Sequence, residues 1–125
     1  MKAILRSGFL VLAMTLAFAV PADAGPFEDG LAAYRRDDYA AAMHLWRPLA
    51  EQGDTLAQSN LGVMYEFGLS VPQDIVQAHM WFDLAVEHGD ERAKINRAIA
   101  ASLMTPDQLA EAQRMAREWL AKHQQ

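Results

Sequence analysis

The sequence predicts an all-α fold, an α-solenoid of about three stacked antiparallel helical hairpins. The first observation is an internal repeat with a period of 36 residues, which holds for six identities without a gap. The paired residues are Asp38 and Asp74, Ala42 and Ala78, Glu51 and Glu87, Gly53 and Gly89, Asp54 and Asp90, and Ala57 and Ala93. Periods of about 20–50 residues are typical of stacked structural repeats. The second observation is that apolar residues recur at spacings of three and four, which is the period of a helix and not of a strand.

Six helices are expected, and local signals at their ends define them. They span residues 26–36, 39–52, 55–67, 75–88, 91–103 and 106–122. The first helix begins at Pro26, because a proline's missing N–H is no loss in a first turn. The later helices each follow a side chain that accepts hydrogen bonds from the free N–H groups of a first turn. These N-caps are Asp38, Asp54, Asp74, Asp90 and Thr105. Gly53 and Gly89 end the second and fourth helices, since glycine readily adopts a left-handed backbone.

The apolar faces indicate how these helices pack. Gly62 lies beside the apolar stripe of the third helix, where a glycine costs about 1 kcal/mol against alanine. Close approach of a neighbouring helix is the simplest compensation. The central repeat is expected at residues 53–93. The fifth helix loses the pattern, because Arg97 and Ala98 stand where Leu61 and Gly62 are expected. A degenerate last unit is typical of a terminal cap, so residues 90–122 are interpreted as capping helices.

The first 24 residues predict a secretory signal peptide rather than a part of the fold. Lys2 and Arg6 precede an apolar run over residues 8–20, and small residues end at Ala24. We expect cleavage after Ala24 and a periplasmic or secreted protein. The alternative is a retained membrane anchor, but 13 helical residues rise only about 20 Å against a hydrocarbon core of about 30 Å.

Charge and composition exclude several classes of function for the remaining domain, residues 25–125. The net charge is −5, and loss of residues 1–24 removes two basic residues and one acidic residue, which leaves −6. Without a basic cluster, such a chain is not expected to bind nucleic acid or to insert into an anionic membrane. The chain has no cysteine, so it offers no thiol nucleophile, thiolate metal site or disulfide.

The central unit resembles a Sel1-like repeat (SLR), a relative of the tetratricopeptide repeat. The resemblance is carried by AQSNLGVMYEFG at residues 57–68, by VPQD at 71–74 and by the Trp81-Phe82 pair. The flanking hairpins match more loosely. One departure is Ser70, where the family usually has a second glycine in the linker. The resemblance implies a tetratricopeptide-like superhelix that binds other proteins. Members of the family act as adaptors and regulators, in bacteria often in envelope signalling, secretion or host contact.

A second face of the third helix, which the core stripe does not need, is the candidate partner-binding groove. With two residues of the fifth helix, its members are Leu56, Ser59, Val63, Glu66, Phe67, Lys94 and Arg97. Apolar side chains beside charged ones are suited to an extended or helical peptide. The alternative is that Val63 and Phe67 simply pack on the neighbouring hairpin.

No pattern in the sequence predicts a catalytic, cofactor or metal site. His79 and His88 are nine residues apart, not the one-turn spacing of a metal-binding helix pair. Acidic pairs lie at the starts of helices, where carboxylates cap the first turn and favour the helix dipole. No serine has the flanking motif of a nucleophile elbow. The last helix is amphipathic with a polar face of mixed charge, so packing on the fifth helix is expected rather than membrane binding.

These observations favour a non-enzymatic protein-interaction module, an adaptor, scaffold or regulator in the bacterial cell envelope, with another protein or peptide as partner and no cofactor. Two alternatives remain open. One is an envelope enzyme or peptidoglycan-associated factor, which only the expected location suggests. The other is an adaptor anchored in the inner membrane by a retained signal segment. Self-association through an exposed hairpin face is also possible.

Overall fold

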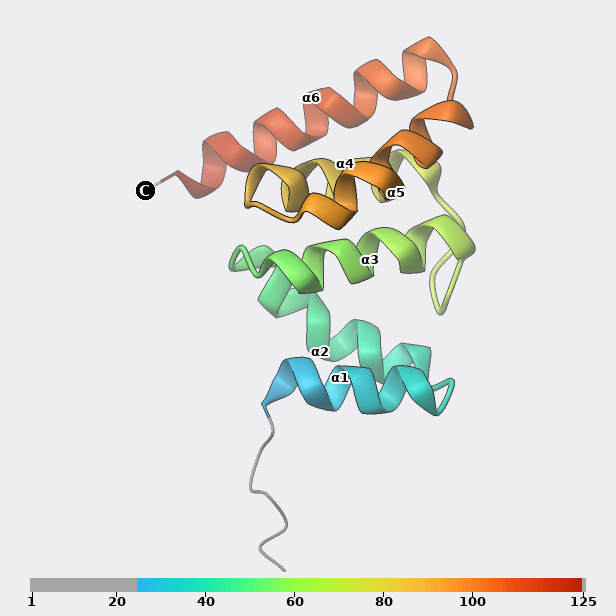
Figure 1. The fold of residues 1–125 in the computed structure, drawn as a ribbon, viewed down its shortest axis with the longest axis vertical. Coiled ribbons are helices and arrows are strands. Elements are labelled where there is room, and N and C mark those ends of the chain that lie inside the picture. The colour runs from blue at the N-terminus through green and yellow to red at the C-terminus, as the bar shows by residue number, and fades with distance from the viewer. Residues whose placement is uncertain (1–24, 125) are drawn as a thin grey trace, which may run out of the picture.

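A computed structural model of the chain describes residues 25–124, which form six α helices joined as consecutive hairpins (Figure 1). The helices are α1 (Pro26–Arg35), α2 (Tyr39–Glu51), α3 (Thr55–Phe67), α4 (Ile75–Glu87), α5 (Glu91–Ser102) and α6 (Pro106–His123). Every expected helix is present, and the ends agree within one residue. The prediction of an all-α solenoid is confirmed. The expected signal peptide lies outside the described residues. Within residues 25–124, no helix is both long and apolar enough to cross a membrane.

The helices form two layers. Each of α1 to α4 packs on the next helix in the chain, and in Figure 1 α1, α3 and α5 lie in front while α2 and α4 lie behind. The last helix, α6, packs on α4, so the expectation that it packs on the fifth helix is wrong. The reason is that α5 buries only Ala93 and Ala100, while α6 brings Trp119 onto Trp81 of α4.

Every expected N-cap is formed. Asp38, Asp54, Asp74, Asp90 and Thr105 each accept a hydrogen bond from a backbone N–H in the first turn of the next helix. Gly53 and Gly89 have φ angles of 94° and 100° and turn the chain between hairpins. The linker after α3 holds Ser70 at a φ of 61°, so a serine there takes the left-handed conformation that favours glycine.

Within each of the first two hairpins, a glycine of one helix packs against an aromatic ring of the other. Gly30 of α1 faces the indole of Trp46 on α2, and Gly62 of α3 faces the ring of Phe82 on α4. A Cβ atom on either glycine would overlap the ring opposite. Both rings are buried, and the indole Nε1 of Trp46 donates a hydrogen bond to the backbone carbonyl of Phe27 at 3.1 Å. Both hairpins therefore share one packing feature, an aromatic ring in contact with a glycine of the preceding helix.

Candidate functional site

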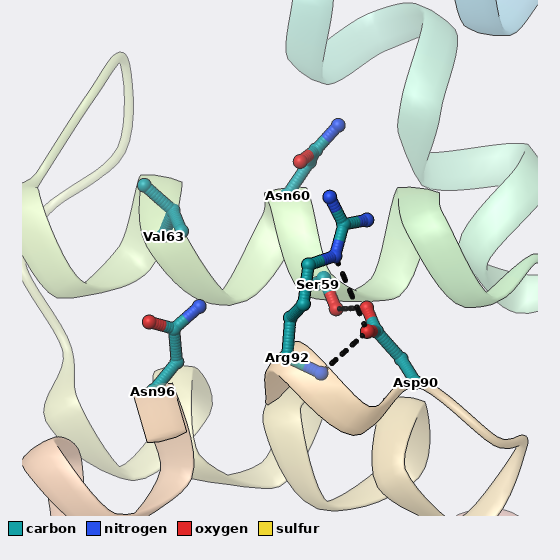
Figure 2. A pocket seen from close by; sticks show the side chains of 6 residues that line it. All are labelled: Ser59, Asn60, Val63, Asp90, Arg92 and Asn96. Carbon is teal, nitrogen blue, oxygen red and sulfur yellow. Dashed lines mark hydrogen bonds and ion pairs between the residues drawn. The ribbon is translucent and has the colours of Figure 1, made fainter. Parts of the chain in front are cut away.

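A groove opens between α3 and α5 (Figure 2). Its volume is about 180 Å³. Its lining residues are Ser59, Asn60 and Val63 from α3, the N-cap Asp90, and Arg92 and Asn96 from α5. We call this set the α3–α5 groove. Arg92 and Asn96 lie one helical turn apart, so both project from α5 toward α3.

A buried hydrogen bond joins the two helices at one end of the groove. The hydroxyl of Ser59 donates to the carboxylate of Asp90 at 2.6 Å, and the two residues are 9% and 8% exposed. Asp90 also accepts from the backbone N–H of Arg92 at 3.0 Å and lies 3.7 Å from its guanidinium. Burial alone would raise the pKa of Asp90, but the hydrogen bonds from Ser59 and the Arg92 backbone and the Arg92 charge outweigh it. The pKa of Asp90 is therefore below its usual value.

Removing this hydrogen bond is expected to destabilise the fold in a pH-dependent way. Ser59→Ala should lower the free energy of unfolding by about 1–3 kcal/mol at neutral pH, because a buried carboxylate loses its donor. The folded-state pKa of Asp90 lies below the unfolded value, so its stabilisation is present above about pH 4 and is lost as the pH falls through the folded-state pKa. The difference in the free energy of unfolding between Ser59→Ala and the wild type should therefore become smaller in acid.

Urea unfolding of both proteins at a series of pH values measures this difference. Ser102→Ala is the matched control, because Ser102 is exposed and donates only to the Ile99 carbonyl of its own helix. A Ser59→Ala defect that stays constant down to strong acid would contradict this account of Asp90.

The walls of the groove carry two carboxamides in equivalent positions. Asn60 and Asn96 are separated by the repeat period, and both line the groove. In Figure 2 the Asn96 side chain points from α5 toward α3, whereas the Asn60 side chain points from α3 away from α5. A carboxamide offers both a donor and an acceptor, which matches the alternating groups of a peptide backbone. Val63 provides an apolar contact at the other end of the groove.

Exposed apolar side chains lie on or next to the two helices that form this groove. The large hydrophobic residues that are exposed within residues 25–124 are Leu56, Phe67, Ile95, Ile99 and Leu103, with exposed fractions of 41%, 66%, 67%, 50% and 66%. All five belong to α3 or α5, or directly follow α5. An exposed apolar surface with a polar groove is typical of a protein-binding site.

The structure brings together only part of the site that the sequence predicted. Ser59 and Val63 line the groove, and Leu56 and Phe67 are exposed on α3. Phe67 therefore does not pack on the neighbouring hairpin, whereas Val63 contacts a small buried cluster of Ala78, Phe82 and Ala100. Glu66 is buried, and this burial raises the pKa of its carboxyl.

Lys94 and Arg97 lie apart from the groove. Both line a separate cleft between α4, α5 and α6, where Arg97 pairs with Asp83 at 2.7 Å.

Sequence reasoning missed Asn60, Asp90, Arg92 and Asn96 as groove residues. The repeat itself carried a signal for two of them, because an asparagine recurs after 36 residues on the same helix face.

His88 and His123 contact neighbouring side chains of the fold. His88 Nδ1 contacts the Gln58 side chain at 2.9 Å, and Gln58 also donates to the Ala50 carbonyl of α2 at 3.0 Å. His123 stacks on Trp119 with ring centroids 3.8 Å apart. Within the part of the chain that the structure describes, no group of three or more His, Asp or Glu side chains could hold a metal ion.

Comparisons with known proteins agree with the helical-repeat fold. The family model described as the Sel1 repeat matches residues 25–54 and 55–90, just over half of the chain. Over 51 residues the chain is 43% identical to chitin synthase regulator SKT5 from Malassezia restricta, a match that covers 40% of this chain. A crystal structure of a protective antigen present in uropathogenic Escherichia coli strains, displaying an SLR fold, superposes with a TM-score of 0.74 at 33% identity over 78% of this chain. The chain spans 4% of the length of the first relative and 22% of the second.

Proposed function

Because this chain belongs to the Sel1 repeat family, we propose that it is a non-enzymatic interaction module whose α3–α5 groove binds a segment of a partner protein. Sel1 repeats generally mediate protein–protein interaction. The observation that carries the proposal is the location of the exposed apolar side chains, all of which are on or next to the two helices that form the groove.

The polar residues of the groove would recognise the partner's backbone, and the apolar residues beside it would supply most of the binding free energy. Asn60 and Asn96 can each bond to a peptide group, while Phe67 and Ile99 offer contact area that is now in water. Burial of apolar surface stabilises a complex by about 25 cal/mol per Å² before the entropic costs of association. A groove of about 180 Å³ accommodates a side chain or a short stretch of backbone, not a drug-sized ligand.

The cellular setting belongs to the same proposal. Residues 1–24 are proposed to act as a signal peptide, which would make the module an envelope adaptor or regulator. The likeness to a protein named as a regulator supports this class of role. The mass of the purified protein distinguishes a processed module that begins at Gly25 from an anchored protein that retains residues 1–24.

A pull-down with groove variants tests the proposal. Phe67→Ser with Ile99→Ser removes exposed apolar area without disturbing the core, so partner capture after crosslinking in cells should fall by about tenfold or more. His44→Ser, an exposed change on α2, is the matched control and should capture the partner normally. Equal capture by the double variant and the control would place the binding site elsewhere and contradict the proposal.

A further inference from the structure

A second cavity lies on the other side of α5, between α4, α5 and α6. Its volume is about 380 Å³, at the lower end of the range of about 300–1,000 Å³ that is typical of ligand sites. Its lining includes His79 from α4, Lys94, Arg97 and Ala98 from α5, and Leu109 and Gln113 from α6. We call this set the α5–α6 cleft. It exists because α6 packs on α4 and leaves α5 largely uncovered.

The cleft is lined by residues at the sequence positions that hold a glycine and an aromatic ring in the first two hairpins. Trp46 and Phe82 each lie eight residues after the N-cap of their helix, and each ring sits on a glycine of the preceding helix. In the third hairpin the residue eight positions after Thr105 is Gln113. The residue that corresponds to Gly62 by the repeat period is Ala98. Both residues line the cleft, so the third hairpin has no aromatic ring at this position.

We propose that the α5–α6 cleft binds an aromatic side chain from an acidic segment of a partner protein. The equivalent sequence positions hold an indole in the first hairpin and a phenyl ring in the second. Ala98 and Leu109 form apolar walls for such a ring, and the guanidinium of Arg97 supplies a cation for its face.

The charge around the cleft favours an acidic partner. Of the six described helices, α5 alone has a net positive charge, with Arg92, Lys94 and Arg97 against Glu91, in a chain whose net charge is −5. Asp83 already pairs with Arg97, whereas Lys94 is half-exposed and, among the described residues, pairs with the exposed Glu91 alone. Lys94 is therefore the cation at the cleft that a partner carboxylate can reach.

A buried polar group beside the cleft lacks a hydrogen-bond partner within residues 25–124. His79 is 3% exposed, and its Nδ1 has no hydrogen-bond partner among the described residues. Burial lowers the pKa of His79, so the imidazole is neutral near pH 7 and one ring nitrogen can accept a hydrogen bond.

A variant whose own side chain fills the cleft tests this inference. The probe is a short fluorescein-labelled peptide with a central tryptophan between glutamates, and its binding is followed by fluorescence anisotropy. The double variant Ala98→Gly, Gln113→Phe reproduces the glycine-and-ring pair of the second hairpin. We expect wild type to bind the peptide saturably and this variant to bind at least about tenfold more weakly.

Two further measurements keep the test independent of folding and of the α3–α5 groove. Lys94→Glu changes an exposed side chain and should weaken binding by a similar factor, whereas Asn96→Ala lies outside the cleft and should not. Absence of saturable binding, equal binding of a peptide with alanine in place of tryptophan, or unchanged binding by the filled variant would each overturn the inference. The inference does not depend on the proposed function, because weaker binding after Asn96→Ala would point to the groove and not to the cleft.

Discussion

Trp46→Ala is expected to destabilise the protein by about 3–5 kcal/mol, the usual cost of deleting a fully buried large aromatic side chain. The Trp46 ring is 1% exposed and packs against Phe27 and Tyr34, with ring centroids 6.0 and 5.8 Å away. The substitution also removes the hydrogen bond from the indole to the Phe27 carbonyl. It therefore leaves a cavity against Gly30 and detaches α1 from α2. A domain of this size has a free energy of unfolding of about 5–15 kcal/mol, so the loss is a large fraction of the total.

Thermal or urea unfolding followed by circular dichroism measures this loss. Trp119→Ala is the matched control, since Trp119 is only partly buried at the end of the array, where it packs edge-on against Trp81. The control should cost clearly less than Trp46→Ala. Equal losses, or a Trp46→Ala loss below about 1 kcal/mol, would mean that the first hairpin is not held by the ring on the glycine.

Gly62→Ala is expected to destabilise the protein although alanine is the better helix former. Alanine gains about 1 kcal/mol in helix propensity, but its Cβ would overlap the buried ring of Phe82. Phe82 is fully buried, so its ring can yield only by disturbing its neighbours, and overpacking of this kind typically costs about 1–3 kcal/mol. The net result should be a lower melting temperature, with the two hairpin helices α3 and α4 forced apart.

Two companion variants isolate the steric cause. Ala98→Gly is the reverse change at the equivalent position of the third hairpin, where no ring is present, and should lose only about the 1 kcal/mol of helix propensity. Adding Phe82→Leu to Gly62→Ala should recover part of the loss, because the smaller side chain vacates the space. A double variant that is only additively worse would show that the two positions do not interact.

The repeat and the helix ends could be predicted because their signals are local. An aspartate at an N-cap acts on the two or three residues that follow it, and a glycine such as Gly53 acts on one turn. The packing of α6 on α4 was not predictable in this way. It depends on how little apolar surface α5 offers after Ala93 and Ala100 are buried, and on contacts between residues as distant as Trp81 and Trp119.

The candidate site shows the same division between local and distant effects. Lys94 and Arg97 were expected in the groove, but they share a face of α5 that lines the α5–α6 cleft. Which face of α5 meets α3 is decided by the burial of Ala93 and Ala100 on α4, and that rotation turns Arg92 and Asn96 toward the groove instead. Sequence spacing defines the faces of a helix, but tertiary packing decides which face each neighbour receives.

The central claim is that the α3–α5 groove binds a partner protein, and site-specific photocrosslinking tests it most directly. A photoreactive residue is placed at Asn60 in the groove, at Leu109 in the α5–α6 cleft, and at exposed His44 on α2, each in the full chain in cells. We expect one protein to be captured from position 60 and not from position 44, with loss of that product when Phe67→Ser and Ile99→Ser are added. Capture from position 44 alone, or capture from position 60 that survives the double substitution, would contradict the groove as the binding site.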